Sequence, residues 1–254
     1  MLLLTALEFL TIVRLRRPRE ADLGQLARSQ AVFPLVGLLL GLVLVGLDEG
    51  LSEVMPAPAV ASLLVVALIV ATGGLHLDGL ADTCDGLFGG DTPEERLVIM
   101  RDSRVGSYGL LAVASLLLLK WAAFLSLASP VRPGALLLAP ALGRWAIVAA
   151  VAPFPYARPE GLGKAMHQVA WPYPALAGVI ALAASVAFFA GWGLALFGFA
   201  SVLSWLVAWY VRGKIGGTTG DVYGAIAEMV EVAVLLFAAS GQETGWLAAW
   251  LWRG

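Results

Sequence analysis

Residues 168–211 read QVAWPYPALAGVIALAASVAFFAGWGLALFGFASVLSWLVAWYV and contain no charged side chain. A membrane-spanning helix needs about 20 consecutive apolar residues to cross a hydrocarbon core of about 30 Å. This stretch is therefore long enough for two spans. Gly191-Trp192-Gly193 provides a turn between them, because glycines permit tight turns and tryptophan favours membrane interfaces. The stretch predicts a pair of helices that cross a membrane twice.

The composition of the whole chain points the same way. Of its 254 residues, 60% are hydrophobic and only 13% are charged, whereas soluble domains average about 45–50% apolar and about 25% charged. The formal net charge of −2 offers no basic face to a nucleic acid. The single cysteine, Cys84, excludes an internal disulfide and a cysteine-rich zinc site. We expect an all-α, polytopic membrane helical bundle with no nucleic-acid partner.

Five further apolar segments complete the predicted bundle. They lie at about Ala31–Leu47, Ala57–Leu75, Tyr108–Leu127, Gly134–Ala152 and Val222–Ser240. About seven spans follow, and an eighth only if Trp246–Trp252 enters the interface. The apolar segment Met1–Val13 is too short to cross and precedes its arginines, unlike a signal peptide, so we expect an interfacial helix. No repeat or linker divides the chain, so residues 1–254 are predicted to form a single integral-membrane domain.

Lysine and arginine residues are distributed unevenly between the two ends of this seven-span arrangement. One end carries Arg14, Arg16, Arg17, Arg19, Arg28, Arg96, Arg101, Arg104, Arg158, Lys164, Arg212 and Lys214. The opposite end carries only Arg132 and Arg253, while Lys120 and Arg144 fall inside spans. By the positive-inside rule, the first end is cytoplasmic. The long polar loops then all lie on the cytoplasmic side.

The most chemically distinctive stretch is GGLHLDGLADTCDG at residues 73–86. Asp78, Asp82 and Asp85 are spaced i, i+4 and i+7, which places them on one helical face. Three carboxylates this close repel one another unless a cation lies between them, and oxygen ligands favour Mg²⁺ or Mn²⁺ over zinc. Such a metal also takes phosphate oxygens from a substrate, which indicates phosphoryl-transfer chemistry. The alternative is a helix that leaves the membrane here with solvated aspartates.

Three further polar segments are predicted at the same end. Residues 101–109, RDSRVGSYG, combine arginines with glycines that could wrap an anion, or the arginines could anchor the membrane edge. Residues 158–164, RPEGLGK, mix charge with loop-forming glycines. Residues 214–225, KIGGTTGDVYGA, form a glycine-rich loop that ends in Asp221 at the mouth of a helix. The loop lacks the Gly-Lys-Ser/Thr of a Walker motif.

Ionisable residues also occur inside the predicted spans, where they are costly and usually functional. Glu228 and Glu231 lie in the last span, and Glu228 shares a helical face with Asp221, so the two could point at one cavity. Arg144 could form an internal ion pair with one of these acids. The two histidines, His76 and His167, could either contact phosphate or be structural.

Together these motifs resemble the cobalamin synthase (adenosylcobinamide-GDP ribazoletransferase) family. The resemblance rests on residues 73–87, 99–109, 157–163 and 216–225, with Phe33–Gly37 near the first span. It covers nearly the whole chain in the family's order. The CDP-alcohol phosphotransferases are a wider comparison, because Asp82-x-x-Asp85-Gly86 partly matches their aspartate motif. Their second aspartate pair is absent from this sequence.

The resemblance implies an Mg²⁺-dependent transferase that joins adenosylcobinamide-GDP to α-ribazole, or to its 5′-phosphate, and releases GMP in cobalamin biosynthesis. A ribose hydroxyl would attack the phosphorus nearer the corrinoid. Mg²⁺ would be held by Asp82 and Asp85, with Asp78 beside them. The residues expected to bind substrate phosphate are Arg101, Arg104, Lys164, Arg158 and His76. Asp221 or Asp102 would accept the hydroxyl proton, and we favour Asp221 because a glycine-rich loop can bring it close to a substrate.

The resemblance also implies a multi-pass protein of the bacterial or archaeal cytoplasmic (inner) membrane, with the active site on the cytoplasmic side. Because the corrinoid is amphipathic and bulky, we expect a wide mouth on that side. The sequence is compatible with a homo-oligomer as well as with a monomer. The rival functions are a phospholipid-type phosphotransferase, which would need the missing aspartate pair, and a secondary transporter, which would often show repeated halves that this sequence lacks.

Overall fold

The computed structural model describes residues 1–15, 22–167 and 169–243. The expectations for Arg16, Arg17, Arg19, Gln168, Arg253 and Trp246–Trp252 fall outside these ranges. The described residues form helices joined by loops, with one isolated backbone bridge between Tyr156 and Thr218 in place of any strand. The predicted all-α class is therefore confirmed.

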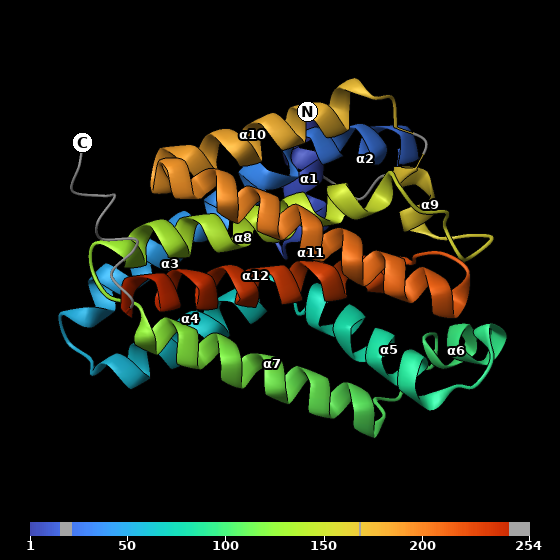
Figure 1. The fold of residues 1–254 in the computed structure, drawn as a ribbon, viewed down its shortest axis with the longest axis horizontal. Coiled ribbons are helices and arrows are strands. Elements are labelled where there is room, and N and C mark those ends of the chain that lie inside the picture. The colour runs from blue at the N-terminus through green and yellow to red at the C-terminus, as the bar shows by residue number, and fades with distance from the viewer. Residues whose placement is uncertain (16–21, 168, 244–254) are drawn as a thin grey trace.

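The helices follow one another along the chain with short connections (Figure 1). In order they are α1 (Leu2–Leu10), α2 (Leu23–Ser29), the 3-10 helix η1 (Gln30–Val32), α3 (Phe33–Ser52), α4 (Ala57–Thr72), α5 (Leu75–Gly89), α6 (Pro93–Ile99), α7 (Ser107–Ser126), α8 (Val131–Val151), α9 (Leu162–Met166), α10 (Pro172–Phe189), α11 (Gly191–Ile215) and α12 (Gly220–Glu243).

Six helices in the described ranges are long and apolar enough to cross a membrane, and α4 together with α5 adds a seventh candidate. The first candidate runs without interruption from Leu23 to Ser52, so α2 and η1 continue into α3. The break between α10 and α11 falls at Ala190, whose φ is 48°, directly before the predicted turn at Gly191. These helices confirm the predicted polytopic bundle with about seven spans. The short helix α1 is also confirmed, while its interfacial position stays a prediction.

The second predicted span differs from expectation. The predicted span Ala57–Leu75 is shorter in the structure, because α4 ends at Thr72 and α5 leaves it at an angle of 89°. Gly73 and Gly74 both adopt positive φ values, 62° and 71°, a region that glycine enters without the steric cost of a Cβ atom. We call this bend the elbow. The three aspartates therefore lie on a separate helix, α5, rather than at the end of a straight span.

Most of the long helices run roughly along the long axis of the molecule, with α5 oblique to them, and α12 packs against α5, α7, α8 and α11 (Figure 1). Helices α8 and α12 are the most buried of the candidate spans, which identifies them as the centre of the bundle. The connections that carry α6 and α9 lie at one end, while the α3–α4 and α7–α8 connections lie at the other (Figure 1). The polar motifs after α5, before α9 and before α12 are thus gathered at one end.

A buried ionic network connects three of these helices. Lys120 of α7 donates hydrogen bonds from Nζ to Oε2 of Glu228, at 2.6 Å, and to Oε2 of Glu231, at 2.8 Å. Arg144 of α8 pairs with the other carboxylate oxygen of Glu231. All four side chains are buried, so each charge depends on its partners. The predicted ion pair of Arg144 with an acid of the last span is confirmed.

Breaking this network is expected to destabilise the protein. Lys120→Met leaves Glu228 and Glu231 in the bundle without their lysine, and removing one partner of a buried ion pair typically costs about 3–5 kcal/mol. We expect a loss of this size in the free energy of unfolding, measured by denaturant titration of the purified protein in detergent. Lys120→Met combined with Glu228→Gln should recover part of the loss, because one stranded carboxylate is gone. An equal loss in both variants would contradict a role for charge balance.

The grouping of loops at one end also predicts a labelling pattern. In a Cys84→Ser background, single cysteines at the exposed positions Glu94, Glu160 and Arg212 should react with an impermeant thiol reagent from the same side of the membrane. A cysteine at the exposed Glu53 should react only from the opposite side. Reaction of any two of the first three from opposite sides would overturn this arrangement.

Candidate active site

Two loops are held together at the polar end of the bundle. The backbone N–H of Thr218 donates to the carbonyl of Pro155 at 2.9 Å, and that of Ala157 donates to the carbonyl of Thr218 at 2.8 Å. This pairing aligns the loop before α9 with the loop before α12. As a result, Nη2 of Arg158 lies 2.7 Å from Oδ2 of Asp221, with both side chains largely shielded from solvent. The glycine-rich loop thus places Asp221 next to a cationic partner, while its expected position close to a substrate stays a prediction.

Two glycines allow α5 and α12 to approach closely. A Cβ atom on Gly79 would lie 2.6 Å from the carbonyl oxygen of Asp221, and one on Gly224 would lie 3.1 Å from Cα of His76. Contacts this short leave no room for a side chain, so only glycine fits at Gly79. The approach brings the carboxylates of α5 towards Asp221. Asp82 experiences the charges of Asp78, Asp221, Arg158 and Asp85.

A cavity of about 260 Å³ lies where these elements meet. Its polar lining includes His76, Asp78, Tyr156, Arg158, Asp221 and Tyr223. These residues come from α5, from the loop before α9 and from the start of α12. Acidic, basic and aromatic side chains thus share one partly open cavity, which is the arrangement expected for a site that binds a charged, ring-containing ligand.

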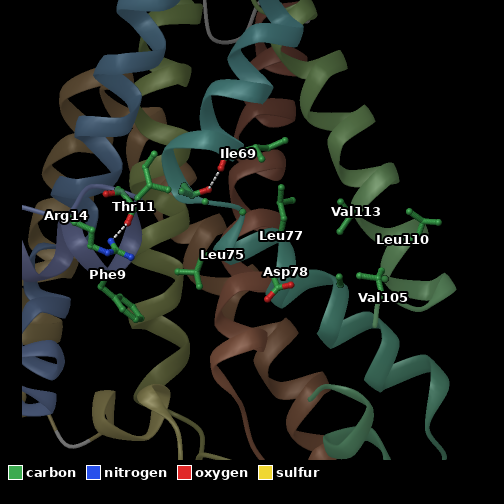
Figure 2. Close-up of a pocket in the computed structure, with 16 residues that line it drawn as sticks. Phe9, Thr11, Arg14, Ile69, Leu75, Leu77, Asp78, Val105, Leu110 and Val113 are labelled. Carbon is green, nitrogen blue, oxygen red and sulfur yellow. Dashed lines mark hydrogen bonds between the residues drawn. The ribbon is translucent and has the colours of Figure 1, made fainter. Parts of the chain in front are cut away.

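A second, wider cavity of about 810 Å³ adjoins the first, lies over the elbow and is shown in Figure 2. The two cavities share Phe9, Leu75 and Asp78 in their linings. Asp78 therefore stands at their junction. The expected wide mouth on the cytoplasmic side stays a prediction.

Asp85 has a different environment from the other two aspartates of α5. Its Oδ2 accepts a hydrogen bond from the backbone N–H of Gly106 at 2.7 Å, and its Oδ1 accepts one from Gly109 at 2.8 Å. A Cβ atom on either glycine would overlap the carboxylate. The first N–H groups of a helix have no partner within the helix, so Asp85 satisfies donors at the start of α7. Both oxygens of Asp85 are engaged by the protein, and its predicted metal role stays a prediction.

The predicted metal site is not preformed. Within the described ranges, no group of three or more His, Cys, Asp or Glu side chains is close enough together to hold a metal ion. The donor chemistry nevertheless suits Mg²⁺, because Asp78 and Asp82 present carboxylate oxygens near Asp221. Mg²⁺ usually binds through one or two carboxylates together with substrate phosphates, so a preformed protein cage is not required.

The predicted phosphate-binding residues separate into two groups. Arg158 and His76 line the smaller cavity. Arg101, Arg104 and Lys164 are exposed and are absent from the linings of both cavities described above. The ammonium group of Lys164 donates to the carbonyl of Pro159 at 2.5 Å. The structure therefore brings together two of the five candidates, and the roles of all five stay predictions.

The two candidate bases also occupy different environments. Asp221 lines the smaller cavity. Asp102 instead pairs with Arg104 on the surface, with Oδ2 2.6 Å from Nη2. Hydrogen bonds from the Arg104 side chain and backbone lower the pKa of Asp102 to about 2. A carboxyl group with so low a pKa is a weak proton acceptor, and this one lies away from the cavity lining.

His167 and Glu228, the remaining candidate residues, each have a partner within the protein. Nε2 of His167 lies 2.7 Å from the Tyr223 hydroxyl, which lies 2.8 Å from Oγ1 of Thr218. Burial lowers the pKa of His167, so this imidazole is neutral at pH 7. Glu228 pairs with Lys120 and is absent from the lining of the cavity that contains Asp221. The prediction that Glu228 and Asp221 point into one cavity is therefore wrong. Tyr156 also lines this cavity but was not predicted, because the sequence marks it only by its position two residues before Arg158.

The fold and the site define a class of protein: a polytopic helical membrane protein with a cavity that joins carboxylates, an arginine and aromatic side chains at one end of the bundle. The family model described as "Cobalamin-5-phosphate synthase" matches residues 2–239, so the chain belongs to that family. This confirms the resemblance inferred from the motifs.

Individual relatives agree with the family assignment. The chain is 41% identical over 239 residues to an adenosylcobinamide-GDP ribazoletransferase of Desulforamulus reducens, a match that covers 94% of this chain and 96% of the relative. It is 40% identical over 240 residues to a protein of the same name from Pseudomonas paraeruginosa, covering 93% and 97% of the two chains. No solved structure shows a significant match to the chain.

The environment of Asp85 predicts a stability difference between two neighbouring aspartates. Asp85→Asn turns one acceptor into an amide donor that faces a backbone N–H, so at least one hydrogen bond is lost at a cost of about 1–3 kcal/mol. We expect this loss in denaturant unfolding measured without added metal. Asp82→Asn is the matched control, and it should keep or raise stability because it removes repulsion from Asp78 and Asp221. Equal stabilities of the two variants would contradict the structural role of Asp85.

Proposed function

We propose that this protein joins adenosylcobinamide-GDP to α-ribazole, or to its 5′-phosphate, and releases GMP in cobalamin biosynthesis. The proposal is supported by membership of the cobalamin-5-phosphate synthase family and by the activity named for relatives that match it over most of their length. The single structural observation that carries it is the cavity that contains Asp78, Arg158 and Asp221. This cavity offers charged groups for a diphosphate and aromatic surfaces for a nucleoside.

The proposed reaction is a phosphoryl transfer. The ribose hydroxyl oxygen forms a bond to the phosphorus nearer the corrinoid, and the phosphoanhydride bond to the GMP phosphate breaks. GMP leaves with the bridging oxygen, and the hydroxyl proton passes to a carboxylate. Because the attacking and leaving oxygens lie roughly in line, the protein must hold the ribose hydroxyl and the departing GMP on opposite sides of the reacting phosphorus.

Asp221 is the proposed proton acceptor. It lines the cavity, its Oδ2 accepts a hydrogen bond from Oγ1 of Thr219 at 3.2 Å, and Arg158 fixes its position. The buried Nε of Arg158 has no hydrogen-bond partner among the described residues. Arg158 lines the same cavity and holds its positive charge beside Asp221, and charge-assisted hydrogen bonds from a guanidinium to phosphate are strong. A general base so placed typically accelerates a reaction by about 10²–10⁴-fold.

The proposal includes dependence on Mg²⁺, with Asp78 and Asp82 as the residues that would hold the ion and Asp221 beside them. When bound, Mg²⁺ supplies positive charge to the diphosphate of the substrate. Asp85 then supports the site indirectly, because it fixes the start of α7 next to these carboxylates.

We also propose that the site faces the cytoplasm and that the protein lies in the cytoplasmic membrane of a bacterium or archaeon. Arg96, Arg101, Arg104, Arg158, Lys164, Arg212 and Lys214 belong to the loops and helix ends at the site's end of the bundle. At the other end, Arg132 is neutralised by Asp48, with two contacts of 2.6 Å between the guanidinium and the carboxylate. The excess of positive charge at the site's end supports a cytoplasmic orientation.

A reconstitution experiment tests this function. Purified protein in detergent, supplied with adenosylcobinamide-GDP, radiolabelled α-ribazole and Mg²⁺, should form a labelled corrinoid product and equimolar GMP. Chelation of the metal should stop turnover, and Mg²⁺ should restore it. Folded protein that yields no labelled product with α-ribazole or with its 5′-phosphate would overturn the proposal.

The same assay distinguishes the two candidate bases. Asp221→Asn should lower kcat by about 10²–10⁴-fold at saturating Mg²⁺, because the proton acceptor is lost. Asp102→Asn is the control, and it should cost about tenfold or less because Asp102 pairs with Arg104 outside the cavity lining. Recovery of the Asp221→Asn rate at high Mg²⁺ would identify Asp221 as a metal ligand instead. A larger loss at Asp102 than at Asp221 would reverse the assignment.

A further inference from the structure

The wider cavity has a shape and lining that the proposed chemistry does not explain. It is a groove of about 810 Å³ that runs across the elbow between α1 and α7. In Figure 2, Phe9 and Arg14 lie on one flank, Leu110 and Val113 lie on the other, and Asp78 lies between them. The groove thus places a broad surface next to one of the proposed metal-binding carboxylates.

The lining of this groove is mainly apolar, and most of its polar groups are already engaged. The guanidinium of Arg14 donates to the carbonyl of Thr11 at 2.7 Å, and Oγ1 of Thr72 donates to the carbonyl of Leu68 at 2.8 Å. Asp78, in contrast, is exposed, and its carboxylate makes no hydrogen bond within the described part of the chain. A ligand of this groove would therefore meet apolar walls and two charged groups, the carboxylate of Asp78 and the exposed guanidinium of Arg14, whose Nη1 donates to backbone carbonyls.

The groove and the smaller cavity are continuous in their lining, because both include Phe9, Leu75 and Asp78. A molecule that fills the groove and carries a phosphate at the Asp78 end would place that phosphate towards Arg158 and Asp221. The two cavities also differ in capacity. The smaller one, at about 260 Å³, falls below the range of about 300–1,000 Å³ typical for drug-sized ligands, whereas the groove lies in its upper part.

We propose that the groove over the elbow binds the corrinoid half of adenosylcobinamide-GDP, with the diphosphate at Asp78. This inference rests on the proposed function and identifies where its larger substrate lies. A macrocycle bulkier than a drug-sized molecule does not fit the smaller cavity, so of the two connected spaces only the groove has room. Its apolar flanks match an amphipathic ring system. The 89° elbow, made by two left-handed glycines, is the structural feature that creates the space.

Narrowing the groove tests the proposal. Leu110→Trp and Val113→Trp, singly and together, add bulk to its α7 wall. Leu118→Trp is the matched control, because Leu118 lies on the same helix, is 67% exposed compared with 64% for Leu110, and is not part of the lining. The probe is adenosylcobinamide without a nucleotide, and equilibrium dialysis with the protein in detergent gives its Kd from the corrinoid absorbance.

The double variant should bind adenosylcobinamide at least tenfold more weakly than the unaltered protein, while GMP binding and the KM for α-ribazole change less than twofold. Leu118→Trp should change none of these values. If the double variant does not fold, Leu110→Trp alone can be used, because this position is already mostly exposed. It should also bind adenosylcobinamide more weakly than the unaltered protein. Unchanged corrinoid binding in variants that still fold would overturn the inference.

The remaining outcomes separate this inference from the proposed function. If the unaltered protein forms product but the narrowed variants bind corrinoid normally, the function stands and the location is wrong. If the narrowed variants lose only a co-purified lipid, detected by mass spectrometry, the groove is a lipid site and the inference is overturned. If the unaltered protein neither binds corrinoid nor forms product, both proposals fail.

Discussion

The close approach of α5 to α12 at Gly79 and Gly224 is the contact on which the candidate site depends. A side chain at Gly79 would meet the backbone of Asp221 at 2.6 Å, so any larger residue must separate the two helices. The carboxylates of α5 and of α12 come from segments far apart in the sequence, and only this contact brings them to one cavity. The elbow at Gly73 and Gly74 makes the approach possible, because it turns α5 by 89° away from the direction of α4.

The carboxylates of Asp78, Asp82 and Asp221 repel one another at this contact, so other interactions must hold α5 and α12 together. The network of Lys120, Glu228, Glu231 and Arg144 lies inside the bundle on α7, α8 and α12 and is buried throughout. Removing any one charge would strand another in a poorly solvated interior. Such a network tolerates little change in the relative positions of its helices. It holds α12 in place while the first turn of that helix carries Asp221.

Much of this arrangement can be predicted from the sequence, because membrane helices are recognised from the length and hydropathy of apolar segments. The apolar runs gave the class and about seven spans, and the i, i+4, i+7 spacing placed three aspartates on one helix. The elbow was missed although its signal, two adjacent glycines, is present at Gly73 and Gly74. A pair of glycines shows that the chain can bend but not by what angle. That angle depends on the packing of α5 against α12.

The site was less predictable, because its contacts join residues distant in the sequence. The spacing of Asp85 is the same whether it binds a metal or caps a helix, and its partners, Gly106 and Gly109, lie on another helix start. Likewise, the sequence placed Asp102 and Asp221 equally at the mouths of spans. The structure distinguishes them, because the backbone pairing of Thr218 with Pro155 and Ala157 directs Arg158 to Asp221 in the cavity lining, whereas Asp102 pairs with Arg104 on the surface.

The hydrogen bonds of Asp85 also join α5, which carries the carboxylates, to α7, which forms one wall of the groove. The Asp85 carboxylate holds the first turn of α7, and the same turn continues into Leu110 and Val113, which form one wall of the groove. One turn earlier on α5, Asp82 interacts with the charges of Asp78 and Asp221. A single short helix therefore sets both the position of the groove wall and the position of the carboxylates. Because α5 meets the elbow at one end and α7 at the other, the carboxylates and the groove wall have the same structural support.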